Sequence, residues 1–320
     1  MKKLLILFYI LLPYYIFSQT KDSLNLRSLV YKNSLIEVQT KYLSGTKLKN
    51  KYLNYNIDYG YSTLVKTLIP ISVKHKKFKI MGNLTYFKEH FKFNNFEIKD
   101  QTAKNLKLIP KHVNISGEKL LTSLRFINIL NVFNKKVVLT TNLNSYTNSD
   151  WEFKKLTGTL IITLPIKTES KKSMFSLGVA NLLRENNQFI AFPIISYNKL
   201  LSNNYLLSAI IPYKIKFSKI YNQDFNIGIE AKLATDWPLV DVAKSNFYGS
   251  NKDLILSSLG IDIGFDVEKR LNKYFVLGAE SGISNIIRSE MQDENRKKLV
   301  ENDPYNNFYF KIKLGLRIKR

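Results

Sequence analysis

The side chains that could carry acid–base or nucleophilic chemistry are few and widely spaced in this chain. Its 320 residues include three histidines, His75, His90 and His112, and no cysteine. His90 lies ten residues before Asp100, so a paired base and carboxylate could be drawn there. A hydrolase needs a base beside its nucleophile, and no spacing in the sequence places the two together. We therefore predict no catalytic residue, no cofactor-binding residue and no enzymatic activity.

No metal site is predicted either. The chain has no thiolate to offer, and two or three scattered histidines do not make a zinc site, which wants three or four ligands at defined geometry. The carboxylates and amides of residues 291–303 are a conceivable calcium rim, but they match no coordination template. An ordinary polar loop is the simpler interpretation. The absence of cysteine also excludes a disulfide scaffold.

Charged residues that alternate with apolar ones form a more specific pattern near the end of the chain. If these segments are strands whose apolar residues face lipid, the residues between them face the interior of a barrel. The interior residues predicted in this way are Glu230, Asp262, Asp266, Glu268, Glu280, Lys311, Lys313 and Arg317. An acidic strip would then lie beside a basic strip. Two interpretations stay open: cross-strand ion pairs that fill a sealed lumen, or a pore whose opposed charges select solutes.

A period of two dominates the chain from residue 35 onward, as expected for strands with one apolar and one polar face. The strands are expected near 35–43, 52–61, 66–74, 78–88, 119–130, 136–146, 156–166, 173–182, 189–198, 205–216, 224–234, 255–268, 274–285 and 307–319. Many reach the roughly 9–11 residues that a tilted strand needs to cross a bilayer. The predicted fold is all-β, a single antiparallel transmembrane β-barrel of 12–16 strands. A soluble barrel or sandwich is the alternative.

The connections are predicted to alternate between short periplasmic turns and long extracellular loops. The turns are 75–77, 131–135, 198–204 and 269–273, and the loops are 89–118, 235–253 and 286–306. An even number of strands must lie between the last two turns, whereas the ranges above give three. Either 205–218 folds at Pro212 into two short strands, since proline cannot donate to a strand ladder, or 235–253 contains a further strand.

The N-terminal residues have the composition of an export signal. Lys2 and Lys3 precede an uncharged apolar run over 4–12, and Ser18 offers a small residue before the expected cleavage site. The run is too short to span a bilayer as a helix. We predict a signal peptide over 1–18, an N-terminal periplasmic segment over 19–34 and an outer-membrane β-barrel over 35–320.

The chain is strongly basic, with a formal net charge of +24 at pH 7. Nucleic acid is not an expected partner, because the chain carries an export signal and its lysines are scattered singly along strands and turns. The richness in Asn, Ile, Tyr, Phe and Lys is typical of A+T-biased coding. The alternative explanation of the positive charge is functional: it would attract the protein to anionic lipid headgroups or to anionic solutes.

Several segments resemble an uncharacterised outer-membrane β-barrel family of Gram-negative bacteria. They are Phe17-Ser18-Gln19, the long run of hairpins, and Phe192-Pro193-Ile194 and Ile210-Ile211-Pro212-Tyr213 on either side of the Ser202-Asn203-Asn204 turn. The resemblance covers roughly residues 30–320. It implies a barrel in the outer membrane, with outer-membrane lipid and the barrel assembly machinery as partners, and it supplies no site residues.

The functional expectation that follows is a channel or uptake pore for small hydrophilic solutes. The alternative is a sealed barrel with a structural or adhesive role through its loops 89–118, 235–253 and 286–306. An outer-membrane lipid hydrolase or acyltransferase is the least supported of the three, because no nucleophile and base are placed together.

Overall fold

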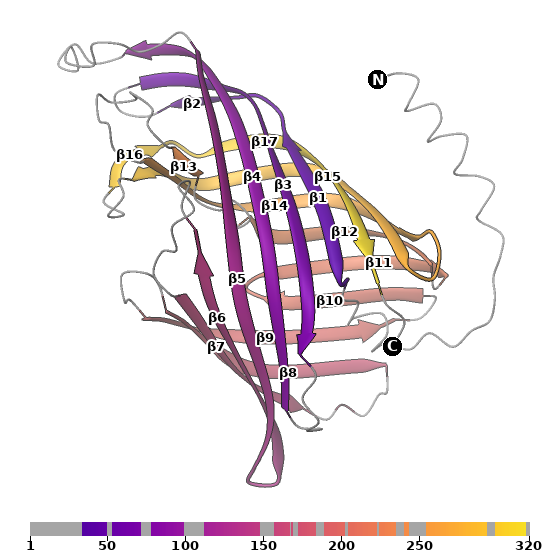
Figure 1. Ribbon diagram of the computed structural model, residues 1–320. Helices are drawn as coiled ribbons and strands as arrows, with labels where there is room; N and C mark the ends of the chain where they lie inside the picture. Colours follow the sequence, from indigo (N-terminus) through magenta and orange to yellow (C-terminus); the bar gives the residue numbers. More distant parts are fainter. Residues whose placement is uncertain are drawn as a thin grey trace.

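The strands of this protein form one closed antiparallel sheet. The computed structural model describes residues 34–49, 53–71, 78–98, 112–147, 157–166, 168, 172–183, 189–201, 204–222, 224–234, 240–242, 254–292 and 298–317. The 17 strands of these described ranges all belong to the same sheet (Figure 1). β1 pairs with β3 on one side and with β17 on the other, and this closes the sheet. Fourteen strands make up the barrel, and β2, β13 and β16 are short additions to it.

The strands have the following bounds: β1 Ile36–Leu43, β2 Thr46–Lys49, β3 Leu53–Ile71, β4 Phe78–Ile98, β5 His112–Val132, β6 Lys135–Tyr146, β7 Thr157–Ile166, β8 Ser173–Leu183, β9 Phe189–Leu200, β10 Tyr205–Ile211, β11 Lys214–Asn222, β12 Phe225–Ala234, β13 Val240–Val242, β14 Leu254–Arg270, β15 Phe275–Gln292, β16 Lys298–Asn302 and β17 Tyr305–Leu316. Among the described residues, no helix is long and apolar enough to cross a bilayer. The predicted signal peptide, 1–18, and residues 19–33 of the next segment lie outside the described residues.

The predicted fold class and strand number are confirmed, but three strand ranges were wrong. The ranges 52–61 and 66–74 form one strand, β3, because nothing in the Ser-Thr-Leu-Val segment between them favours a turn. The range 205–216 is instead divided between β10 and β11, which meet at a turn over Pro212 and Tyr213. This division supplies the even number of barrel strands that the turns require. The 235–253 segment also contains a strand, the three-residue β13.

Two predicted loops are also largely strand. Residues 89–118 were expected to form a loop, yet β4 runs on to Ile98 and β5 already begins at His112. The two strands stay paired from Phe78↔Asn128 up to Asn94↔His112. In the same way, much of 286–306 lies in β15, β16 and β17. Because the outward residues of these extensions are polar, the period-two pattern fades there although backbone pairing continues.

Successive connections lie alternately at the two ends of the barrel, which we call the turn end and the loop end. The turn end includes the β5–β6, β11–β12 and β14–β15 connections, and the loop end includes the β4–β5, β12–β14 and β15–β17 connections. At the β5–β6 turn both central residues, Phe133 and Asn134, have positive φ, 47° and 61°, as a type I′ hairpin turn requires. In the β14–β15 turn, the Asn272 side chain accepts hydrogen bonds from the backbone N–H groups of Tyr274 and Phe275 at 2.8 and 2.9 Å.

The strands separate an apolar outer face from a polar inner face. On β17, Phe308 and Ile312 are 54% and 47% exposed, whereas Asn307 and Tyr309, on either side of Phe308, are 3% and 0% exposed. Pairing carries this division around the barrel, since directly paired residues lie on the same face. Apolar side chains are exposed on most barrel strands, for example Val38, Ile69, Leu84, Leu124, Leu143, Ile162, Val179, Ile195, Ile215, Ile229, Phe265, Ile283 and Leu314.

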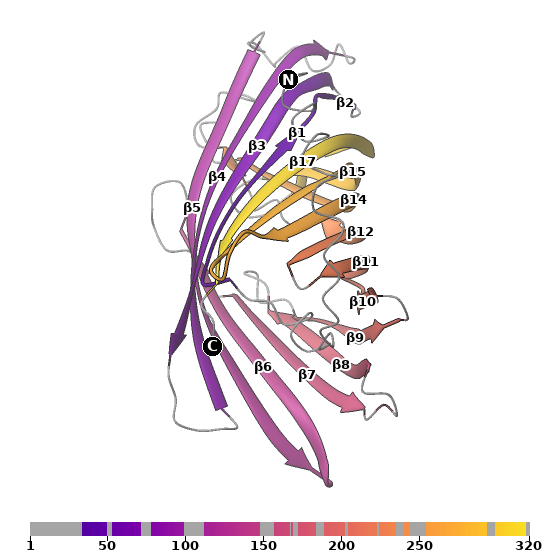
Figure 2. The ribbon, with the colours of Figure 1, turned by 90° about the vertical axis from the view of Figure 1, so that its right-hand side faces the viewer.

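Glycines allow the inner side of the β14–β15–β17 wall to pack closely. Gly264 and Gly282 are paired across β14 and β15, and Gly282 is paired with Tyr309 on β17. A Cβ on Gly264 would overlap the Tyr309 hydroxyl, and one on Gly282 would overlap the carbonyl oxygen of Ile263. The missing side chains therefore leave the space in which the Tyr309 ring lies. Figure 2 shows this wall continuing through β1 and β3 into the long strands β4 and β5.

Candidate functional site

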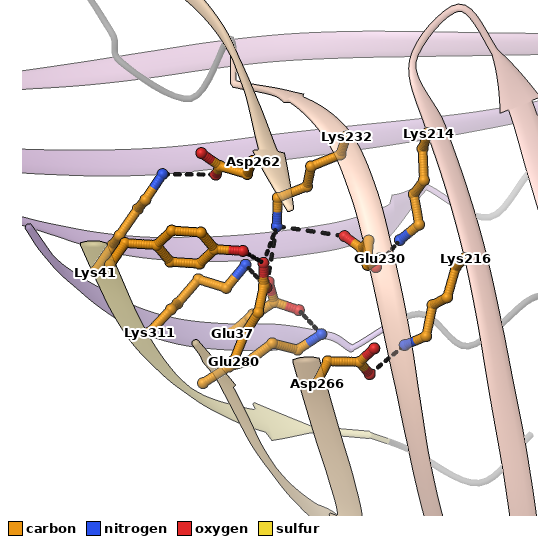
Figure 3. Close-up of polar contacts among 12 residues, drawn as sticks. Glu37, Lys41, Lys214, Lys216, Glu230, Lys232, Asp262, Asp266, Glu280 and Lys311 are labelled. Atoms are coloured by element: carbon orange, nitrogen blue, oxygen red, sulfur yellow. Dashed lines mark hydrogen bonds and ion pairs between the residues drawn. The ribbon is translucent and has the colours of Figure 1, made fainter. Parts of the chain in front are cut away.

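The most distinctive group of side chains is a network of opposite charges on the inner face. We call it the ion-pair network, and it comprises Lys41, Lys214, Lys216, Glu230, Lys232, Asp262, Asp266, Glu280, Tyr309 and Lys311. Its members come from β1, β11, β12, β14, β15 and β17, so they converge from strands far apart in the sequence (Figure 3). Each occupies an inward position, because the residues on either side of it along the strand face outward.

Glu280 is the centre of this network. Its carboxylate accepts hydrogen bonds from Lys232 Nζ at 2.7 and 3.0 Å and from the Tyr309 hydroxyl at 2.7 Å, and it forms an ion pair with Lys311. Lys232 also lies 3.3 Å from Glu230. The side chains of Glu280 and Lys232 are only 8% and 13% exposed. Burial of these charges is tolerable because each ion is paired and hydrogen-bonded.

Further ion pairs connect strands that are not neighbours in the sheet. Lys41 on β1 reaches Asp262 on β14 at 2.7 Å, across β17 and β15, and both side chains are almost fully buried. Lys216 on β11 pairs with Asp266 on β14, across β12. The network therefore spreads over the concave inner surface of this wall and joins its strands through side chains as well as through the backbone.

The structure brings five of the eight residues predicted for the interior into this network: Glu230, Asp262, Asp266, Glu280 and Lys311. The other three lie nearer the turn end. Arg317 donates to Glu268 at 3.2 Å, and Lys313 lies 3.4 Å from Glu37.

Sequence reasoning missed the cations that complete the network: Lys41, Lys214, Lys216 and Lys232. A signal for two of them was present, because Lys214 and Lys216 alternate with the apolar Ile215 and Phe217. It was obscured by the prediction that 205–216 is one strand, since the turn at Pro212 resets which residues face inward.

The opposite wall, formed by β5 to β8, has a different inner surface. Its inward positions mix polar side chains with apolar ones such as Leu121, Ile127, Val138 and Ile161, and most are partly exposed; the polar ones are Ser123, Asn142, Asn144, Thr157, Thr159, Thr163 and Ser176. Charged residues also lie on this side, among them Arg125, whose Nε donates to Asn142 at 2.7 Å. Solvent therefore reaches the inner face on this side, whereas the ion-pair network is packed.

The loop end is narrowed by β13, the described part of the connection between β12 and β14. This strand pairs with β14 through Val240↔Leu256 and Val242↔Leu254. It also contacts β5, which is not a neighbour of β14 in the sheet. β13 thus lies between two walls of the barrel.

At the same end, a hydrogen bond from Lys298 on β16 holds the pKa of the exposed Glu301 carboxyl below its usual value.

The histidine expected in a loop lies in a strand and contacts a serine. His90 is on β4, where its Nδ1 lies 2.7 Å from Ser116 Oγ of β5, and its ring stacks on Tyr61 with 5.1 Å between centroids. None of the described carboxylates hydrogen-bonds to its other ring nitrogen. A serine and a histidine without an orienting acid do not make a hydrolytic triad.

The remaining catalytic and metal-site expectations concern residues that the structure describes only in part. His75 and Asp100 lie outside the described residues, and of His112 only the backbone is described. Within the described ranges, no group of three or more His, Asp or Glu side chains is arranged to hold a metal ion.

Comparisons with known proteins find similarity only at the level of solved structures. No family model matches the chain, and no curated protein matches it. It is similar to an outer membrane channel from Pseudomonas putida F1, with 9% identity, a TM-score of 0.37 and coverage of 89% of this chain and 97% of that one. For the transport unit of the autotransporter AIDA-I from Escherichia coli the identity is 11%, the TM-score 0.40 and the coverage 95% and 94%. For the NanC porin the identity is 8%, the TM-score is 0.35, and the coverage is 88% of this chain and 100% of that one. The fold assignment rests on the strand pairing of this chain itself.

Proposed function

We propose that this protein is an outer-membrane β-barrel that forms a channel for small hydrophilic solutes. The observation that carries the proposal is the division of the barrel surface: apolar outside, and inside a packed charged wall facing a wall whose polar and apolar side chains are partly exposed to solvent. A channel needs an interior that water and solutes can enter, and a lipid-facing exterior that they cannot.

The outer face supports a location in a membrane. Apolar side chains such as Ile263, Phe265, Ile283 and Ile312 are 47–63% exposed, and a soluble protein rarely exposes a continuous apolar surface of that kind. The predicted export signal over 1–18 makes the outer membrane the fitting one. In this arrangement the turn end faces the periplasm, the loop end faces outward, and outer-membrane lipid and the barrel assembly machinery are the expected partners.

The inner face supports passage rather than catalysis. On the β5 to β8 wall, partly exposed threonine, serine and asparagine side chains offer hydrogen-bonding groups to water and to solutes. The ion-pair network neutralises most of its own charges. We therefore propose no enzymatic activity, no cofactor and no metal.

One observation favours a second candidate, a sealed barrel that acts through its surface loops. β13 pairs with β14 and contacts β5, so it restricts the loop end. A loop end restricted in this way is compatible with a channel of small diameter, and also with a lumen that is closed to solutes.

Planar-bilayer recordings distinguish the two candidates. We expect the folded protein to give discrete conductance steps, and a variant with residues 240–250 replaced by a short Gly-Ser linker to give larger ones, because the linker removes β13 from the loop end. Both proteins are first shown to be β-rich by circular dichroism, and detergent without protein serves as the blank. If neither folded protein conducts, the barrel is sealed and the channel proposal is wrong.

A further inference from the structure

A second group of interior cations differs from the ion-pair network in its surroundings. Lys66 on β3, Arg125 on β5 and Lys313 on β17 are inward residues in the half of the barrel near the turn end. Lys66 is paired directly with Glu37 of β1, and Lys313 lies 3.4 Å from the same carboxylate. Arg125 lies two strands from Lys66 on the same inner face, near enough to act on it electrostatically. Three cations and one carboxylate leave this group, which we call the basic cluster, with a formal charge of +2.

The donors of the basic cluster are not used up by the protein. Lys66 is exposed and makes no ion pair with any of the described residues. Arg125 uses its Nε in the 2.7 Å hydrogen bond to Asn142, and its two Nη groups have no acceptor among the residues that the structure describes. The bond at Nε fixes the plane of the guanidinium, and the free Nη groups present a planar set of donors.

The contacts of Lys313 and Glu37 show that the cluster is open to solvent. Their closest approach is 3.4 Å, and their side chains are 31% and 23% exposed. By comparison, the side chains of the Lys41–Asp262 pair in the ion-pair network are 5% and 1% exposed. A solute inside the barrel can therefore contact the charges of the basic cluster, whereas the Lys41–Asp262 pair is packed away from solvent.

We propose that the basic cluster is an anion-binding site that makes the lumen select small organic anions bearing a carboxylate or phosphate group. This inference rests on the proposed channel function. A planar anion fits the Nη groups of Arg125 in a bidentate arrangement, and Lys66 and Lys313 supply point charges beside it. Glu37 limits the total charge, which favours a weakly held solute over a trapped one, as conduction requires.

The first test measures ion selectivity as the reversal potential under a KCl gradient at low salt, where screening is weak. We expect the wild-type protein to prefer chloride. The double variant Lys66→Gln/Arg125→Gln should lower the chloride-to-potassium permeability ratio by roughly fivefold, given the interaction of two unit charges with an ion about 10 Å away in water. The matched control Lys199→Gln/Lys219→Gln removes two outward cations, one of which lies over the Tyr221 ring, and should leave the ratio unchanged.

The second test does not need conduction. Citrate is titrated into the folded protein in detergent at constant ionic strength, and the heat of binding is measured, with glucose as the neutral comparison. We expect saturable citrate binding that is weaker by about tenfold or more in Lys66→Gln/Arg125→Gln, since hydrogen bonds to charged groups are lost. Binding should persist in Lys199→Gln/Lys219→Gln.

The two tests separate failure of the channel from failure of the site. Citrate binding that depends on Lys66 and Arg125 in a protein that does not conduct would leave the anion site standing and reject the channel. A conducting protein whose selectivity is the same in the wild type and in Lys66→Gln/Arg125→Gln would overturn the anion site and leave the channel standing. Absence of both citrate binding and anion preference overturns the inference as well.

Discussion

Replacement of Glu280 by glutamine is expected to lower the free energy of unfolding by about 3–5 kcal/mol, the cost typical of breaking a buried ion pair on one side. The carboxylate compensates two ammonium groups, Lys232 and Lys311, and accepts the hydroxyl of Tyr309. Glutamine has a similar shape but no charge. The variant would leave two buried cations facing one another with only Glu230, 3.3 Å from Lys232, to compensate them.

The measurement is urea unfolding of the barrel in lipid vesicles, followed by far-ultraviolet circular dichroism. Glu118→Gln is the matched control, because the Lys88–Glu118 pair has a similar distance, 2.6 Å, but side chains that are 47% and 38% exposed. Exposed pairs contribute only about 0–1 kcal/mol. Glu280→Gln/Lys311→Met should recover part of the loss, since it removes one of the stranded cations. Equal, small losses for Glu280→Gln and Glu118→Gln would show that the network does not stabilise the barrel.

A lysine in place of Ile312 is expected to cost roughly 2–4 kcal/mol, the range for a cation at the bilayer midplane on the lipid face of a barrel. Ile312 is 47% exposed on the outer face of β17, where it is paired with Thr40 and Ala279. Its neighbours Lys311 and Lys313 are cations that the barrel already accommodates on the inner face. The same kind of side chain should therefore be tolerated at 311 and 313 and destabilising at 312.

Asn144→Lys is the control for the Ile312→Lys variant, because it places the same cation at a partly exposed inward position on β6. Its effect should stay within about 0.5 kcal/mol, as for ordinary accessible substitutions. Unfolding in vesicles is measured for both variants at the same lipid composition. An Ile312→Lys protein as stable as the Asn144→Lys protein would mean that residue 312 does not face hydrocarbon.

The alternation of residue types predicts the fold because lipid and the interior make opposite demands on the two faces of a strand. It predicts one face for Asp262, Asp266 and Lys311 with no knowledge of pairing, and the structure places all three in the ion-pair network. The alternation did not predict the strand residues of β4 after Lys88 or of β5 before Glu118. These residues lie beyond the part of the outer face that carries apolar side chains, so polar side chains are acceptable on both faces there. In that region only the backbone pairing of β4 with β5 defines the strands.

The partners within the candidate site could not be predicted in the same way. Lys41 and Asp262 are 221 residues apart in the sequence, and they meet because β1 closes the barrel against β17. A period of two says which face a side chain occupies, but it does not say which strand lies opposite. The Lys214 and Lys216 partners also depend on the turn at Pro212, which shifts the face of every residue in β11.

The central claim is that the apolar face of this barrel lies in lipid and the charged face lines its lumen. The chain has no cysteine, so single cysteines introduced at 311, 312, 313 and 314 can each carry a fluorophore in reconstituted vesicles. A quencher dissolved in the lipid phase should act strongly at 312 and 314, where Ile312 and Leu314 are 47% and 42% exposed, and weakly at 311 and 313. Strong quenching at 311 and 313 with weak quenching at 312 and 314 would contradict the orientation of β17, and with it the lumen and every function assigned to it.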